Sequence, residues 1–338
     1  MLEIKDLSVQ YGKQAPTIEH FNLSMKKGEI ISVVGESGSG KTTVIRAVLG
    51  ALAGGGRVST GDIQFHGHSL LSNTKDEWRN LRGTRISMIF QDSMTSLNPT
   101  MRVGRQMCEG ILRHQRVSRQ EAQQISAELL GQVGLPNPEL VAKRYPHTMS
   151  GGQRQRVMIA MAMACNPKIL FADEPTTALD VTMQAQILDL MNHLKEKRGT
   201  SILLITHDLG VVAKMADRIA VMYAGKIVEY GDARQVFYRP SHPYTWGLLG
   251  AMPNLIQDVK SELYAIPGTP PDLYAPPKGC AFAARCPYAM EACLKEDPPE
   301  FACGQGHGSR CWLLDPRAPD VTPPEGIPPL PKGGSDHV

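Results

Sequence analysis

The chain has 338 residues, of which 42% are hydrophobic and 20% charged, so it can bury a substantial core without disulfide bonds. Its 36 basic and 33 acidic side chains give a formal net charge of +3, which is too balanced to indicate nucleic-acid binding. The longest apolar stretch, residues 157–165, is nine residues long, whereas a membrane-spanning helix needs about twenty. We therefore expect a cytosolic protein that only partner proteins could hold at a membrane.

Before residue 240, apolar runs alternate with helical stretches, a pattern typical of a parallel α/β sheet. Residues 1–7 alternate in the manner of an edge strand and lack the apolar core of a signal peptide. Residues 92–165 are predicted to be mostly helical. The candidates for buried strands are residues 30–34, 86–90, 168–172, 201–206 and 218–222.

A glycine-rich turn, residues 35–42, follows the first of these strands and precedes a helical run at 43–49. Its sequence, Gly-Glu-Ser-Gly-Ser-Gly-Lys-Thr, matches a phosphate-binding loop in the required strand-to-helix context. Glycines let backbone N–H groups surround phosphate oxygens, Lys41 supplies positive charge, and the Thr42 hydroxyl is a Mg²⁺ ligand. The residues expected at the nucleotide are Gly35, Ser37, Gly38, Ser39, Gly40, Lys41, Thr42 and Thr43.

Two carboxylates end the apolar strand at 168–172. An acid at the carboxyl end of a neighbouring parallel strand lies where it can hold Mg²⁺ beside the phosphates, and Asp173 has that position. Glu174 can then accept a proton from an attacking water as a general base. Together with the glycine-rich turn, these residues predict a P-loop nucleotide triphosphatase.

The segment Met149-Ser150-Gly151-Gly152-Gln153 precedes a helical stretch at 154–164 and resembles the signature of the ABC ATPase family, with Met149 in place of the usual Leu. The resemblance implies an α/β fold: a P-loop NTPase (RecA-like) core with an antiparallel β subdomain, and an inserted helical subdomain at 92–165. In that family the signature contacts the γ-phosphate of ATP held by an opposing subunit, so a dimer with ATP at its interface is implied.

Further residues match the family pattern in order. Gln91 resembles the residue that links Mg²⁺ and water to the helical subdomain, and His207 resembles the histidine that contacts the γ-phosphate. Tyr11 resembles the aromatic residue that stacks on adenine. The segment Ala178-Leu179-Asp180 is similar to the loop that crosses the dimer interface.

Residues 92–98 and 239–245 are similar to the dipeptide and oligopeptide importer branch, which also contains nickel importers. This resemblance implies a second, non-identical ATPase subunit, two transmembrane permease subunits and an extracytoplasmic solute-binding protein. The chain would lie peripherally at the cytoplasmic face of the inner membrane. Peptide is favoured over nickel as the solute by this resemblance alone.

Other members of the family act on DNA or ribosomes, and some are catalytically silent regulatory subunits. Lys41 and Asp173 are 132 positions apart (173 − 41) with no sustained heptads between them, unlike the long coiled coil of DNA-repair members. The chain has one cassette, whereas translation factors carry two. The presence of Glu174 and His207 argues against a silent subunit.

Sixteen of the 25 prolines and five of the seven cysteines lie after residue 252, so an irregular C-terminal domain is expected. Cys303 is left as a spare, and the other four cysteines have neither zinc-type nor ferredoxin-type spacing. Family resemblance favours a [4Fe–4S] cluster on them, with zinc or plain reduced thiols as alternatives. The expected ligands are Cys280, Cys286, Cys293 and Cys311. The expected domains are an ATPase domain at 1–240, a cysteine-rich domain at 241–320 and a disordered tail at 321–338.

Overall fold

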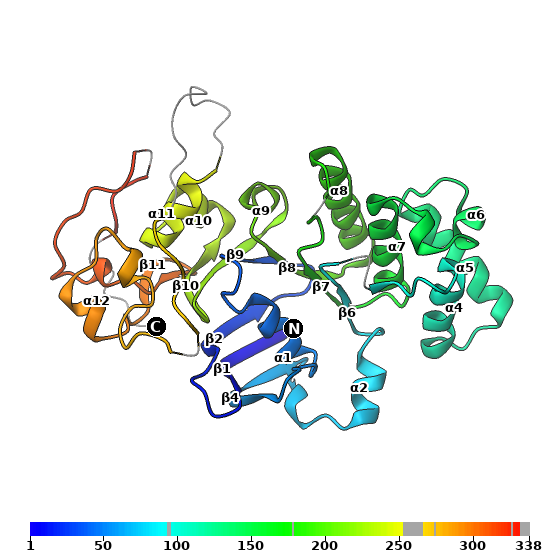
Figure 1. Cartoon of the computed structure of the whole chain (residues 1–338), viewed down its shortest axis with the longest axis horizontal. Coiled ribbons are helices and arrows are strands. Elements are labelled where there is room, and N and C mark those ends of the chain that lie inside the picture. The colour runs from blue at the N-terminus through cyan, green and yellow to red at the C-terminus, as the bar shows by residue number, and fades with distance from the viewer. Residues whose placement is uncertain (93–95, 178, 253–265, 274, 326, 332–338) are drawn as a thin grey trace. The chain divides into compact units, whose positions relative to one another are not determined.

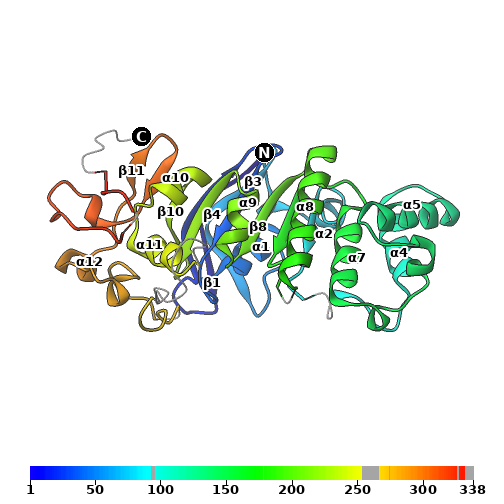
Figure 2. The same cartoon turned by 90° about the horizontal axis from the view of Figure 1, so that it is seen from above.

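The computed structural model describes residues 1–92, 96–177, 179–252, 266–273, 275–325 and 327–331. Two compact units can be distinguished. The first comprises Met1–Ser24, Ile31–Leu71 and Thr206–Val338, and the second comprises Met25–Ile30 and Ser72–Ile205. Figures 1 and 2 show the elements of both units from two directions. Within the described residues, no helix is both long and apolar enough to cross a membrane.

An antiparallel sheet in the first unit contains the N-terminal strand. The strand order is β2-β1-β4-β5, so β1 lies between two neighbours and the expectation of an edge strand is wrong. The alternation of buried Leu2 and Ile4 with exposed Glu3 and Lys5 shows only that one face is covered, and interior strands have that property too. The strands are β1 (Leu2–Tyr11), β2 (Ile18–Met25), β4 (Gly56–Phe65) and β5 (His68–Ser69).

A second sheet in the first unit is built around β3 (Ile30–Val34), every residue of which is buried. It pairs in parallel with β9 (Arg218–Tyr223), and β9 forms a hairpin with β10 (Lys226–Asp232). The apolar runs at 30–34 and 218–222 therefore form strands, as predicted. Helices of this unit are α1 (Lys41–Val48), α9 (Leu209–Met215), α10 (Ala233–Tyr238) and α11 (Pro243–Gly250).

The C-terminal segment is less irregular than its proline content suggests. β12 (His307–Ser309) pairs antiparallel with β10, and β11 (Phe301–Gly304) pairs with β12, so the segment extends the sheet. This pairing occurs between prolines, because residues 301–309 contain none. Its other elements are η3 (Ala283–Arg285), α12 (Glu291–Lys295) and η4 (Trp312–Leu314).

The second unit holds three parallel strands among its described residues, in the order β8-β7-β6. They are β6 (Ile86–Ile89), β7 (Ile169–Asp173) and β8 (Ser201–Thr206), and they match the predicted strands to within a residue. The region 92–165 is mostly helical, although residues 93–95 lie outside the described part. Helices of this unit are α2 (Lys75–Leu81), α4 (Val103–His114), α5 (Arg119–Gln132), α6 (Pro138–Ala142), α7 (Gly151–Met163) and α8 (Val181–Arg198).

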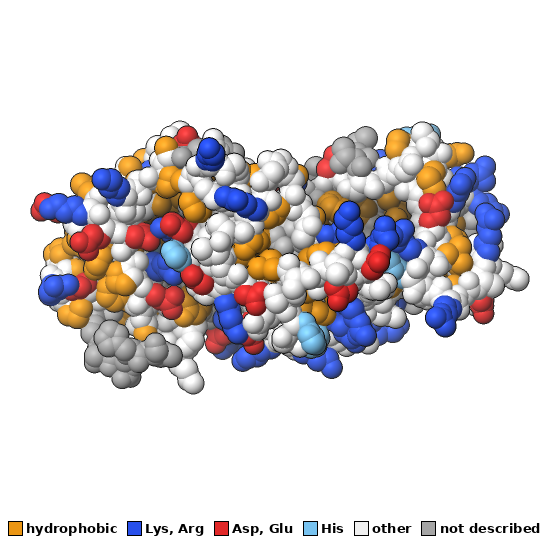
Figure 3. All heavy atoms as spheres, turned by 90° about the horizontal axis from the view of Figure 1, so that it is seen from below, with side chains coloured by type: hydrophobic (Ala, Val, Ile, Leu, Met, Phe, Trp, Pro, Cys, Tyr) orange, Lys and Arg blue, Asp and Glu red, His pale blue; other side chains and the backbone are white. Residues whose placement is uncertain are grey.

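Helix α4 packs against α5, α6 and α7, and α4, α5 and α7 lie together in both Figure 1 and Figure 2. Parallel strands with connecting helices confirm the α/β class. On the face shown in Figure 3, acidic and basic side chains are both spread among hydrophobic and neutral ones.

Candidate functional site

The glycine-rich turn at 35–42 follows β3 and leads into α1. Gly35 has φ +155° and Gly40 has φ +98°, and both are closely surrounded. A Cβ atom would lie 2.1 Å from the Met222 carbonyl oxygen at Gly35, and 2.4 Å from Ile18 Cδ1 at Gly40. Such distances are too short for any other residue. The turn therefore depends on glycine both for its backbone angles and for its close fit against the neighbouring strands.

Lys41 is the first residue of α1, and it is only 6% exposed. Its Nζ atom donates to the carbonyl oxygens of Gly35 and Glu36, both at 2.7 Å. The ammonium group is thus held inside the turn by backbone dipoles. The start of a helix and a lysine surrounded by a tight loop together form an anion-binding site of the kind that holds phosphates.

Tyr11 ends β1 in the same unit and is half-buried. Its ring lies directly over Gly56, because a Cβ atom there would be 2.6 Å from the Tyr11 Cε1 atom. One side of the ring is therefore held against the backbone of β4. His207, also in this unit, is exposed just after β8, and Asp208 beside it caps α9.

In the second unit, β7 ends at Asp173, which is only 3% exposed. The next residue, Glu174, has φ +46°, a left-handed conformation that is strained for a side chain with a Cβ atom. Its N–H donates to the Ile205 carbonyl oxygen at 2.9 Å, which holds that conformation in place. Strain of this kind gathers at functional sites.

The Glu174 carboxylate is held by two donors. Gln91 Nε2, at the end of β6, donates to Glu174 Oε2 at 2.9 Å, and Thr177 Oγ1 donates to the same oxygen at 3.0 Å. The structure thus brings together Gln91 and Glu174, and Asp173 directly precedes Glu174 in the chain. A carboxylate with fixed orientation beside a second, buried carboxylate is suited to bind a divalent cation and to accept a proton from water.

The segment 149–153 forms the start of α7. Ser150 Oγ accepts from the Gln153 N–H at 3.3 Å, and Gln153 Oε1 accepts from the Ser150 N–H at 3.2 Å, which makes a capping box. Gly152 is buried against α8, because a Cβ atom there would be 2.1 Å from Met183 Cε. Ser150 is exposed and Gly151 half-buried, so this helix end is presented at the surface.

Asp180 caps the next helix, α8, by accepting from the Met183 N–H at 2.8 Å. Ala178, in the same predicted interface loop, lies outside the described residues. The predicted nucleotide residues thus fall into two sets. The glycine-rich turn, Tyr11 and His207 belong to the first unit, and the remainder belong to the second.

Three of the four expected cluster cysteines have thiols whose pKa is raised. Burial raises the pKa of Cys280 and of Cys286 to about 11. Burial, and then negative charge on the other three, raises the pKa of Cys311 well above its usual value. The backbones of Cys280 and Cys293 are also hydrogen-bonded, at 2.8 Å. The pKa of Cys303 is raised to about 11 by burial, but its acidic neighbours are glutamates.

These thiols are of the type that binds iron or zinc. However, among the described residues no group of three or more His, Cys, Asp or Glu side chains has the arrangement of a metal site. The cysteines can affect one another's pKa without being arranged to bind a metal, because a charge acts over a longer distance than a metal–sulfur bond of about 2.3 Å. The donor set fits a soft metal in composition, whereas its arrangement here is not that of a bound cluster.

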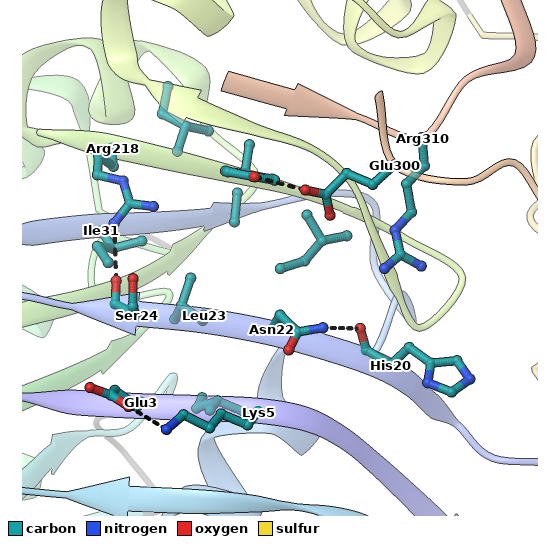
Figure 4. Close-up of a pocket in the computed structure, with 15 residues that line it drawn as sticks. Glu3, Lys5, His20, Asn22, Leu23, Ser24, Ile31, Arg218, Glu300 and Arg310 are labelled. Atoms are coloured by element: carbon teal, nitrogen blue, oxygen red, sulfur yellow. Dashed lines mark hydrogen bonds and ion pairs between the residues drawn. The ribbon is translucent and has the colours of Figure 1, made fainter. Parts of the chain in front are cut away.

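A pocket of about 390 Å³ lies in the first unit, where residues of β1 and β2 face β9 and the C-terminal segment (Figure 4). Arg218 donates to the Ser24 carbonyl oxygen at 3.0 Å at one end of it. Glu300, on the C-terminal side, accepts from the Tyr230 hydroxyl at 2.8 Å. None of the predicted nucleotide or cysteine residues lines this pocket.

Comparisons with known proteins give a consistent result. Residues 18–177 match the model for "ABC transporter", and residues 228–293 match that for "Oligopeptide/dipeptide transporter, C-terminal region". The oligopeptide transport ATP-binding protein OppD of Bacillus subtilis is 52% identical over 97% of this chain and 92% of its own length. The dipeptide transport ATP-binding protein DppD of Lactococcus lactis is 50% identical over 97% of this chain and 95% of its own length.

Among solved structures, a dimeric ATP-binding cassette in a post-hydrolysis state, bound to ADP and phosphate, is similar with a TM-score of 0.62. It is 28% identical and covers 69% of this chain and 99% of that one. This similarity extends over the cassette and identifies the α/β core as that of a P-loop ATPase.

Proposed function

The chain belongs to the family of ATP-binding subunits of oligopeptide and dipeptide ABC transporters, and on this premise we propose that it hydrolyses ATP to drive the import of peptides. The observation that supports hydrolysis most directly is the Glu174 carboxylate, oriented by Gln91 and Thr177 and held in a strained conformation. The alternatives are the import of nickel or another small solute, and a catalytically silent regulatory role. Relatives named for peptide transport favour peptide as the solute.

For the nucleotide, we assign phosphate binding to the turn at 35–43, with Lys41 as the cation. Mg²⁺, when bound to ATP, neutralises phosphate charge. Its protein ligands would be Thr42, Gln91 and Asp173. Tyr11 would stack on adenine. The exposed helix start at Ser150 to Gln153 and the loop at 178–180 would contact the ATP of an opposing subunit, and His207 would contact the γ-phosphate.

In catalysis, Glu174 accepts the proton of the attacking water. Gln91 and Thr177 both donate to Oε2, so the carboxylate keeps one orientation, and a fixed base needs no reorganisation as the proton moves.

The test is Glu174→Gln in the assembled transporter. Glutamine can still accept from Gln91 and Thr177 through its amide oxygen, so the geometry survives while the base is lost. An azido-ATP probe crosslinked to this chain reports both Mg-ATP binding and its conversion to ADP at this site. Binding should persist and conversion should slow by about 10²–10⁴. Glu121→Gln, an exposed capping-box residue of α5, is the matched control. Near-normal conversion in the variant would exclude Glu174 as the base.

We further propose that the chain works with a second, non-identical ATPase subunit, two transmembrane permease subunits and an extracytoplasmic solute-binding protein. It would lie peripherally at the cytoplasmic face of the inner membrane, with the helical subdomain at 92–165 as the docking region. Support comes from the family, whose relatives are named as ATP-binding proteins of oligopeptide and dipeptide transport.

The C-terminal cysteines are proposed to hold a [4Fe–4S] cluster through Cys280, Cys286, Cys293 and Cys311, with zinc as the alternative. The cluster is supported by the effect that Cys280, Cys286 and Cys293 have on the pKa of Cys311. It is not supported by the side-chain arrangement, because the described residues contain no group arranged to bind a metal. The domain boundaries at 1–240, 241–320 and 321–338 also stay predictions, and the last range includes residues 326 and 332–338, which lie outside the described part.

A further inference from the structure

An ion pair joins the C-terminal segment to the glycine-rich turn. Arg285 Nη1 lies 2.7 Å from Glu36 Oε2, and Nη2 lies 2.9 Å from Glu36 Oε1, so the contact is bidentate. The Arg285 side chain is 6% exposed and that of Glu36 is 26% exposed. Both residues belong to the first unit. Planar, two-point pairs of this kind are among the strongest and most directional hydrogen-bonded contacts in proteins.

Glu36 is held at its backbone as well as at its side chain. Its N–H donates to the Tyr244 hydroxyl at 2.9 Å, and its carbonyl oxygen accepts from Lys41 Nζ at 2.7 Å. Tyr244 has no exposed surface, and its ring lies 4.6 Å from that of Tyr223. Glu36 therefore connects the lysine that would contact phosphate to a buried aromatic cluster and to Arg285.

Arg285 is itself fixed by neighbouring backbone. Its Nε atom donates to the Pro267 carbonyl oxygen at 2.7 Å, and Nη1 donates to the Tyr223 hydroxyl at 3.2 Å. Its neighbour Cys286 packs against the same apolar cluster, which includes Tyr244 and Phe282. The position of the guanidinium group thus depends on the order of the cysteine-rich segment.

The negative charge of Glu36 is unfavourable for phosphate binding at the glycine-rich turn. A carboxylate within the turn would repel the phosphate groups that the turn is proposed to bind, and the repulsion would grow with the number of phosphate charges. A bound guanidinium cancels that charge. Removing one partner of a largely buried pair leaves the other charge uncompensated, which is costly.

We propose that Arg285 is a positioning residue for ATP binding: it holds Glu36 and neutralises it, so that the cysteine-rich segment completes the phosphate loop of its own chain. This inference rests on the proposed function, because it concerns the same nucleotide site. It gives the C-terminal segment a role in the ATPase cycle that involves no electron transfer. Loss of order around Cys286 would then weaken ATP binding through Arg285.

The experiment is a double-mutant cycle on nucleotide affinity in the full chain, with Mg-ATP, Mg-ADP and adenosine titrated by calorimetry. Arg285→Gln should weaken Mg-ATP binding by on the order of tenfold. The affinity for Mg-ADP should fall by a smaller factor, and the affinity for adenosine should not change. In a Glu36→Gln background the same change should alter ATP affinity by less than about twofold, since its effect passes through Glu36. Arg285→Lys, which keeps the charge but not the two-point contact, should fall between.

Arg317→Gln is the matched control, because it removes an equal charge from an ion pair with Asp315 in the same segment, and the Arg317 side chain is exposed. An equal loss for ATP and adenosine, or a full tenfold loss in the Glu36→Gln background, would overturn the proposal. If Arg285→Gln does not fold, the double-mutant cycle can be measured with Arg285→Lys in its place, alone and combined with Glu36→Gln. Wild-type protein that fails to bind Mg-ATP would refute the proposed function itself, whereas normal wild-type binding with no cycle coupling refutes only this inference.

Discussion

Glu229 on β10 accepts hydrogen bonds from residues 241 and 242, and its replacement by glutamine should loosen the backbone there. The side chain lies on β10 and has no exposed surface. Oε1 accepts from the Ser241 N–H at 2.7 Å and lies 2.9 Å from His307 Nε2 on β12. Oε2 accepts from the His242 N–H at 3.1 Å. Three groups from two segments thus converge on one buried carboxylate.

Glutamine has the same shape but only one acceptor oxygen. If that oxygen replaces Oε1, the His242 N–H faces an NH₂ group, and if it replaces Oε2, the Ser241 N–H does. In either orientation one buried N–H loses its acceptor, which costs about 1–3 kcal/mol. Because the cost falls on local contacts, local opening should become roughly 5- to 150-fold more frequent.

Hydrogen exchange read by mass spectrometry tests this directly. Amide protection at residues 241 and 242 should fall by that factor in Glu229→Gln, while protection in β7 of the second unit should not change. Glu291→Gln removes an exposed carboxylate paired with Lys295 in α12, and serves as the control with an expected cost of at most about 0.5 kcal/mol. Unchanged protection at residues 241 and 242 would refute the reasoning that Glu229 anchors these residues.

Two further predictions concern the proposed dimer and the cysteines. Ser150→Arg should leave the affinity of this chain for Mg-ATP nearly unchanged, because the exposed start of α7 is proposed to act on an opposing subunit, but it should stop ATP-driven dimer closure measured by crosslinking. Loss of binding in a folded variant would contradict that assignment. Anaerobically purified protein should contain about four iron atoms per chain. The protein should also be brown, and Cys286→Ser should remove this colour whereas Cys303→Ser should not. One zinc ion per chain would replace the cluster hypothesis with a zinc site, and the absence of any metal would end it.

The sequence was most informative where a function occupies consecutive residues. The glycine-rich turn at 35–42 is defined by eight adjacent positions, and the strands at 30–34 and 201–206 are continuous apolar runs, so local reasoning locates them. The capping box at Ser150 and Gln153 is likewise contained within four positions.

Pairing between distant residues has no such local signal. Arg285 and Glu36 are 249 positions apart, and Glu229 and His307 are 78 apart. Nothing in hydrophobic periodicity relates these positions, because each pair forms only once the chain has folded. The similarity of residues 239–245 to peptide importers marked Tyr244 as a family feature, but only the structure shows that its hydroxyl contacts the phosphate loop.

The pairing of β12 with β10 also affects solubility. Without β12, the part of β10 that pairs with it, at Glu229 and Tyr230, would offer unpaired N–H and C=O groups to any passing strand, and Glu229 is buried. Exposed strand edges of this kind recruit other chains and lead to aggregation. With β12 and β11 in place, the outermost strand is only four residues long and bends at an irregularity between Ala302 and Gly304. A chain truncated so that it ends before residue 300 lacks β11 and β12. We expect its expression to yield inclusion bodies rather than a minimal ATPase.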